Sequence, residues 1–201
     1  MMEVIAIIER QIMINEDQIY VVVDIETDGP VAGLYSMLSI GAIATTQEGE
    51  VSSFYRKLVP LEEAEQEPST MAWWKTQPEA WKEVTTNVEP ADTVMREFSK
   101  WVKDLGKRPV FVAHPIAFDY AVVSWYLWKF TNDNPFTDEY GAPITLDLTS
   151  FIAGKYGVTL DKATRKNLPD WMKAGMPEHS HNALEDAKGF GVILRNILNQ
   201  K

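Results

Sequence analysis

The stretch YVVVDIET, residues 20–27, decides the fold class of this chain. Its first residues are largely β-branched and apolar, which predicts a buried central strand. The strand ends in Asp24 and Glu26, and side chains alternate along a strand, so both carboxylates are expected on one face. Such a pair can hold Mg²⁺ or Mn²⁺, which prefer oxygen ligands. Two acids at a strand end can equally be solvated turn residues, so this stretch alone leaves both interpretations open.

The pattern on the carboxyl side of this stretch predicts further strands and helices. Two strands follow a turn at residues 28–30 with a short connection between them, and later strands alternate with helices. The additional strands are expected at residues 36–46, 51–59, 109–113 and 144–148, and the helices at 69–84, 90–105, 118–130, 148–156 and from 182 onward. This order predicts an α/β fold: a mixed five-stranded sheet, in part an antiparallel meander and in part parallel, flanked by helices.

Length and composition favour a single domain. The chain has 201 residues, of which 45% are hydrophobic, enough to bury a substantial core. We assign residues 20–201 to this domain. Residues 1–19 are expected to be a leader that is helical or non-native, or that forms an oligomer contact in a homodimer.

Charge and residue usage narrow the function classes. The net charge of −10 argues against binding nucleic acid by general attraction to phosphates, unless divalent cations neutralise the carboxylates. The lack of cysteine excludes thiol catalysis and thiolate metal sites. No apolar run approaches the roughly 20 residues that cross a bilayer, and no signal peptide is evident. We therefore expect a cytoplasmic protein with no membrane partner.

Two further segments carry candidate functional residues. Asp119 follows a short strand and loop at the start of a helix, where an acid can simply be a favourable cap. In the second segment, Asn182 and Glu185 have the spacing of a capping box, which would place His181 just before the helix and Asp186 one turn inside it. This pattern suits a movable proton acceptor beside a fixed metal ligand, although a histidine in that position is more often a surface residue.

Together the three segments resemble the DEDDh family of DnaQ-like 3′-5′ exonucleases, which belongs to the ribonuclease H-like superfamily. Residues 24–27 (DIET) are similar to the first motif of the family, Phe118-Asp119 to the second, and His181 with Asp186 to the third. The resemblance spans roughly residues 20–198. It implies a ribonuclease H-like fold and metal-dependent 3′-5′ exonuclease activity that releases nucleoside 5′-monophosphates from DNA or RNA.

The resemblance also implies catalytic roles. Asp24, Glu26, Asp119 and Asp186 would hold two divalent cations, Mg²⁺ or Mn²⁺, and His181 would deprotonate the attacking water. An imidazole with an ordinary pKa of about 6.5 can accept a proton near neutral pH. Two cations can activate a water and stabilise the charge that develops on the leaving oxygen.

Substrate contacts are expected from residues next to these motifs and from a basic loop at 157–178. Residues 73–80, with Trp73, Trp74, Gln77 and Glu79-Ala80, are similar to a helix in a subgroup that contains phage exodeoxyribonucleases and a bacterial exoribonuclease. One of the two adjacent tryptophans there is expected to pack in the core, and the other to stack on a base. The candidate contacts to single-stranded or 3′-end nucleic acid are Thr27, His114, Phe118, Trp74, Arg165 and Lys166.

Two positions depart from the family pattern. Pro115 replaces an asparagine common in the second motif, and Asp28 replaces a threonine after the first. Neither change removes a metal ligand, but both make substrate preference less transferable than chemistry.

Two rival functions remain: an inactive nucleic-acid-binding module on the same fold, and an assembly protein. Asp147 is expected to cap a helix rather than bind metal.

Overall fold

The computed structural model describes residues 17–178 and 180–200 and contains the predicted five-stranded sheet. The strands are β1 (Gln18–Thr27), β2 (Met37–Thr45), β3 (Glu50–Lys57), β4 (Arg108–Ala113) and β5 (Thr145–Asp147). They lie in the order β3-β2-β1-β4-β5; β1, β2 and β3 pair antiparallel, while β4 pairs parallel with both β1 and β5. The prediction of a meander extended by parallel strands is therefore confirmed. Residues 1–16 of the expected leader lie outside the described residues.

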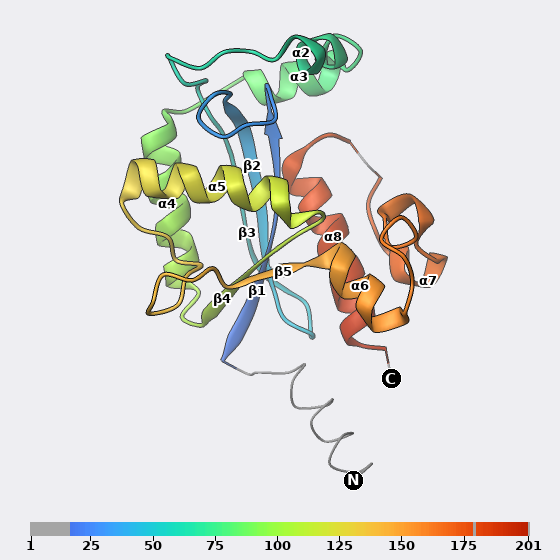
Figure 1. Cartoon of the computed structure of the whole chain (residues 1–201). Coiled ribbons are helices and arrows are strands. Elements are labelled where there is room, and N and C mark those ends of the chain that lie inside the picture. Colours follow the sequence, from blue (N-terminus) through green and yellow to red (C-terminus); the bar gives the residue numbers. More distant parts are fainter. Residues whose placement is uncertain (1–16, 179, 201) are drawn as a thin grey trace.

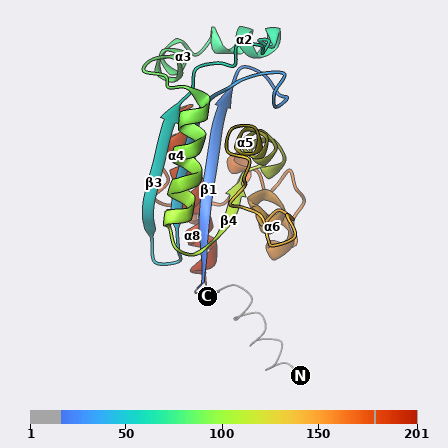
Figure 2. The same ribbon diagram turned by 90° about the vertical axis from the view of Figure 1, so that its left-hand side faces the viewer.

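Helices cover both faces of the sheet (Figures 1 and 2). They are α2 (Pro68–Trp74), α3 (Pro78–Thr85), α4 (Ala91–Asp104), α5 (Ile116–Thr131), α6 (Leu148–Tyr156), the 3-10 helix η1 (Arg165–Asn167), α7 (Asp170–Lys173) and α8 (Ala183–Leu198). Helices α4 and α5 pack together on one side, and α8 packs on β1 and β2 on the other. Among the described residues, no helix combines the length and the apolar character that a membrane span requires.

Alternation along β1 divides its side chains between two apolar cores. Val21, Val23 and Ile25 belong to the core beneath α4 and α5, whereas Val22 belongs to the core beneath α8. Asp24 has the same parity as Val22, so its carboxylate faces α8. The sequence of β1 therefore places its acids on the face that α8 covers.

Two predicted helix boundaries are wrong. The helix expected at 69–84 is interrupted, and Pro78 begins the separate helix α3, because proline lacks the N–H needed in a helix interior but fits the first turn. Helix α5 begins at Ile116, two residues before the expected start, with Pro115 in the N-cap position. Asp119 therefore lies one turn inside the helix and does not cap it.

The start of α8 is fixed by its cap and by close contact with the sheet. The side chain of Asn182 accepts hydrogen bonds from the backbone N–H groups of Leu184 and Glu185, as its spacing predicts. Gly41 of β2, which pairs with Asp24, lies against the backbone of α8: a Cβ at this glycine would lie 2.2 Å from the carbonyl carbon of Ala183. Glycine thus allows α8 to approach the strand that carries Asp24.

Candidate active site

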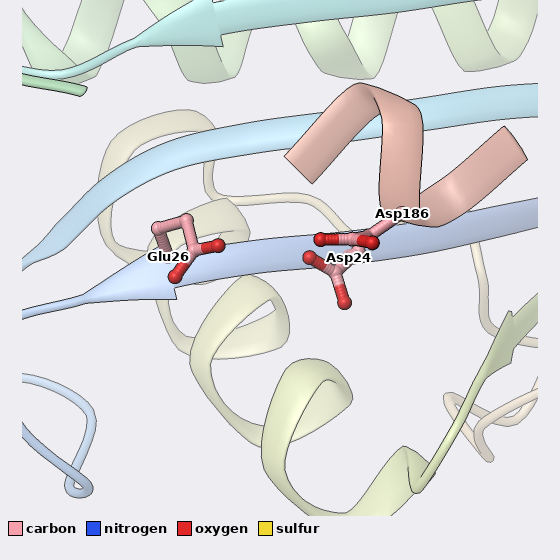
Figure 3. A group of neighbouring side chains, drawn as sticks. All are labelled: Asp24, Glu26 and Asp186. Atoms are coloured by element: carbon pink, nitrogen blue, oxygen red, sulfur yellow. The ribbon is translucent and has the colours of Figure 1, made fainter. Parts of the chain in front are cut away.

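Three of the four predicted metal ligands converge between β1 and α8. Carboxylate oxygens of Asp24, Glu26 and Asp186 lie within 4.8 Å of one another. Figure 3 shows the carboxylates of Asp24 and Asp186 facing each other, with that of Glu26 further toward the end of β1. Since Asp186 is 162 positions from Asp24 in the chain, only the packing of α8 on the sheet brings these groups together.

Asp119 reaches the same region from α5 but lies outside this group of three. Its side chain is 6% exposed, and the backbone N–H of Ile25 is among its hydrogen-bond donors. Its charge raises the pKa of both Asp24 and Glu26, so the three acids share one electrostatic environment. The structure therefore places all four predicted acids around the end of β1.

Burial and mutual repulsion make ionisation of these acids costly. Desolvation, followed by the charges of Asp119, Glu26 and Asp186, raises the pKa of Asp24 well above its ordinary value, and Arg165 opposes the shift. Desolvation and the neighbouring carboxylates raise the pKa of Glu26 to about 8. Desolvation raises the pKa of Asp119 to about 7, although backbone hydrogen bonds oppose it. A site of this kind needs positive charge in order to hold its acids ionised at neutral pH.

This donor set fits hard divalent cations. It offers only carboxylate oxygens, which suit Mg²⁺ and Mn²⁺, and their spacing allows a single ion to contact more than one residue. A bound cation would stabilise the ionised carboxylates against desolvation, and against the mutual repulsion that helps to raise the pKa values of Asp24 and Glu26. Asp24, Glu26, Asp119 and Asp186 are the residues that would hold such ions.

The raised pKa values predict an unusual pH dependence of metal-free stability. Asp24, Glu26 and Asp119 each have a higher pKa in the folded than in the unfolded chain, where the pKa lies near 4. Their contribution to folding stability should therefore be fully present below about pH 4 and fall as pH rises toward the folded pKa of Glu26, about 8. Urea unfolding in EDTA between pH 4.5 and 8.5 should show this fall, and Glu26→Gln should reduce it. An identical pH slope in wild type and Glu26→Gln would contradict the prediction.

His181 lies before α8 and beside Trp73. Its backbone has a φ of 52°, and its ring contacts Trp73 edge-to-face with 4.9 Å between centroids. Among the described residues, the cluster of possible metal ligands consists of Asp24, Glu26 and Asp186, and the ring nitrogens of His181 are not part of it. The predicted position of His181, immediately outside the cap at Asn182, is confirmed; its role as proton acceptor stays a prediction.

The choice of Trp74 as a base-stacking residue is wrong. Its side chain is 1% exposed, and its indole N–H donates to the backbone carbonyl of Thr27. Trp73 is instead 38% exposed and lies between Trp74 and His181. The spacing of apolar residues could not show which of the two tryptophans is buried, because they are consecutive and α2 is only seven residues long.

The two tryptophans should respond differently to truncation. Trp74→Ala is expected to lower the free energy of unfolding by about 3–5 kcal/mol, the usual cost of emptying a buried aromatic site. Trp73→Ala should cost about 1 kcal/mol, because its side chain is partly solvated. Urea denaturation of both variants measures the difference. Equal losses would contradict the assignment of Trp74 to the core.

The other candidate contacts come from the end of β1, from α5 and from the lining of a pocket. Thr27 is partly buried, and its backbone carbonyl accepts the hydrogen bond from the indole of Trp74. Phe118 packs against the core beneath α4 and α5. A pocket of about 500 Å³ is lined by His114, Thr164, Arg165, Lys166 and Phe190. It brings together three of the predicted substrate contacts, two of them cationic.

Two residues that line this pocket, Arg165 and His114, interact with other side chains of the protein. The Arg165 guanidinium lies 3.2 Å from a carboxylate oxygen of Asp186, and His114 stacks on Phe190 with 5.0 Å between centroids. Burial lowers the pKa of His114, which favours its neutral form. Asp147 caps α6 as expected and also accepts a hydrogen bond from the backbone N–H of Ile116. It therefore has a structural role at the start of α5.

The sequence-based predictions did not include Gly41, and they chose Trp74 instead of Trp73 as a substrate contact. Gly41 permits the approach of α8, and a glycine inside a strand pattern could have indicated a close backbone contact. Trp73, rather than its neighbour, borders the site beside His181. The ion pair between Arg165 and Asp186 joins a loop to a helix and has no signature in the spacing of the sequence.

Comparisons with known proteins agree with this arrangement. The sequence model of the family described as the 3′-5′ exoribonuclease Rv2179c-like domain matches residues 19–198 of this chain. The 3′-5′ DNA exonuclease Cap18 of Escherichia coli is 30% identical over 194 residues, which cover 92% of this chain and 94% of Cap18.

Solved structures show the same fold at low sequence identity. The nuclease domain of 3′hExo, a DEDDh family member bound to rAMP, superimposes with a TM-score of 0.64 at 10% identity, covering 90% of this chain and 91% of that one. E. coli exonuclease I in complex with a dA16 oligonucleotide gives a TM-score of 0.66 at 13% identity, covering 92% of this chain but 41% of exonuclease I. The chain therefore belongs to the family of the 3′-5′ exoribonuclease Rv2179c-like domain and is a 3′-5′ exonuclease with the ribonuclease H-like fold of the DEDDh enzymes.

Proposed function

We propose that this protein hydrolyses the terminal phosphodiester bond at the 3′ end of a nucleic acid strand and releases nucleoside 5′-monophosphates, with two Mg²⁺ or Mn²⁺ ions as cofactors. The observation that carries this proposal is the convergence of buried and half-buried carboxylates at the end of β1. When bound, such ions supply an activated water near neutral pH and stabilise negative charge on the phosphate and the leaving oxygen.

The four acids would each contribute to holding the ions. Asp24 and Glu26 come from one strand face, and Asp186 is fixed by the rigid helix α8, so these three approach from opposite sides. Asp119 adds a fourth carboxylate from α5. A support of this rigidity suits a reaction in which the phosphate must be held in one orientation.

His181 is the proposed acceptor of the proton from the attacking water. Its place in the connection before α8, rather than within the helix, allows the ring to move while Asp186 remains fixed. An imidazole is largely neutral near pH 7 and can take up the proton as the bond to phosphorus forms. His181→Ala should therefore impair turnover more than binding of the strand.

Trp73 is the proposed platform for a base near the 3′ end. It is partly exposed and contacts His181, so a base stacked on it would lie close to the reacting phosphate. Lys166 and Arg165, which line the pocket, would contact backbone phosphate. Thr27, Phe118 and His114 stay candidate contacts from the strand end, α5 and the pocket.

The substrate is proposed as single-stranded DNA or RNA with a free 3′ end. The family match is described as an exoribonuclease, and Cap18 as a DNA exonuclease. Matched DNA and RNA oligonucleotides, single- and double-stranded, should be incubated with Mg²⁺ or Mn²⁺ and their products separated by chromatography. Nucleoside 5′-monophosphates released stepwise from the 3′ end support the proposal. Internal cleavage, or binding of the strand without hydrolysis, would overturn it.

A further inference from the structure

Arg165 forms an ion pair with one acid of the carboxylate cluster. Its Nη1 atom lies 3.2 Å from Oδ1 of Asp186, whose side chain is 2% exposed. Its charge also opposes the rise in the pKa of Asp24. Arg165 therefore supplies part of the positive charge that Asp24 and Asp186 require, the same electrostatic role that a divalent ion would take.

The loop around Arg165 has a fixed backbone and a side chain with room to move. Ala163 and Leu168 on either side of it are buried in the core beneath α8, which anchors the segment. The Arg165 side chain itself is 24% exposed and lines the pocket of about 500 Å³ that it shares with Lys166. The Arg165 side chain therefore pairs with Asp186 and lines the pocket at the same time.

We propose that Arg165 and a divalent cation compete for Asp186, and that the arginine released by metal binding moves into the adjacent pocket to bind a backbone phosphate of the substrate. This inference rests on the proposed function and adds a coupling between metal loading and strand binding. The buried carboxylate of Asp186 would exchange one cationic neighbour for another, so a positive charge would stay beside it throughout.

The pocket offers a suitable second position for the guanidinium. Arg165 already lies over the Phe190 ring, with its central carbon 5.8 Å from the centroid, and His114 stacks on the same residue. Lys166 provides a second cation on the pocket wall. Two cations beside a stacked aromatic pair favour an anionic phosphate and disfavour an uncharged ligand.

Metal affinity in the absence of nucleic acid tests the competition. Calorimetric titration of Mn²⁺ should show about tenfold tighter binding to Arg165→Gln than to wild type, because a competitor has been removed. Lys166→Gln, which removes a charge from the same pocket without touching Asp186, should change the affinity less than about twofold. Equal or weaker binding by Arg165→Gln, or the same gain in Lys166→Gln, would overturn the inference.

The wild-type protein provides a test that does not depend on a variant folding. With ¹⁵N-labelled arginine, the guanidinium signal that is absent from Arg165→Lys should shift during titration with Mg²⁺. A guanidinium signal unchanged at saturating Mg²⁺ would overturn the exchange. These measurements need no hydrolysis, so they can succeed or fail independently of the proposed nuclease activity.

Strand binding tests the second half of the inference. In Mg²⁺, Arg165→Gln should raise the KM for a single-stranded oligonucleotide about tenfold, with a smaller effect on kcat, as expected for loss of a phosphate contact. In EDTA, the wild type and this variant should bind the strand with similar affinity, because the wild-type arginine is then held by Asp186. An equal loss of affinity with and without metal would contradict the coupling.

Discussion

Replacement of Asp24 by asparagine is expected to lower the rate of hydrolysis at least about 10³-fold, the scale of loss when a group that stabilises transition-state charge is removed. The same variant should be as stable as wild type in EDTA, or more stable. Its carboxylate is buried among three other acids that raise its pKa, so the neutral amide removes repulsion while preserving shape. The prediction therefore separates the catalytic role of Asp24 from any contribution to the metal-free fold.

Single-turnover hydrolysis and urea unfolding together measure these two effects. Asp104→Asn is the matched control, because Asp104 is an exposed acid on α4 that pairs with Lys100 away from the site. That control should leave the hydrolysis rate within about twofold of wild type. Near wild-type activity of Asp24→Asn, or loss of its folded structure in EDTA, would contradict the assignment.

Gly41→Ala is expected to damage both stability and activity, although Gly41 carries no functional group. Its new Cβ would lie 2.2 Å from the backbone of Ala183 and Leu184, which cannot rotate away as a side chain would. We expect a loss of about 1–3 kcal/mol in the free energy of unfolding from overpacking. A displaced α8 would also move Asp186 and His181, and a misplacement of about 1 Å can cost about 10²-fold in rate.

The matched control for this change is Gly154→Ala in α6. A Cβ at Gly154 meets nothing within 4 Å, so alanine there should stabilise the helix by about 0.5–1 kcal/mol. Urea unfolding and hydrolysis rates should be compared for both variants. A Gly41→Ala protein with wild-type activity and stability would show that α8 does not depend on this close approach.

The sequence was sufficient for features that depend on local pattern. The β-branched run before Asp24 predicted a buried strand, and alternation correctly placed Asp24 and Glu26 on one face. The spacing from Asn182 to Asp186 correctly predicted the cap and the position of the acid one turn into α8. These features follow from strand and helix periodicity, which acts over a few residues.

Features that depend on distant packing were not predictable in this way. The buried position of Trp74 arises from its contact with Thr27 at the end of β1, and Trp73 next to it remains partly exposed. Asp119 was expected at a helix start, but α5 begins earlier and carries it inward. The pairing of Arg165 with Asp186 arises only when the basic loop packs beside α8.

The central claim is that Asp24, Glu26, Asp119 and Asp186 form a site for two catalytic divalent cations. Anomalous diffraction from crystals soaked in Mn²⁺ measures this most directly. We expect two Mn²⁺ peaks at the end of β1, both within coordinating distance of Asp24 and absent from crystals of Asp24→Asn. A site without Mn²⁺ under conditions in which the enzyme hydrolyses its substrate would contradict it.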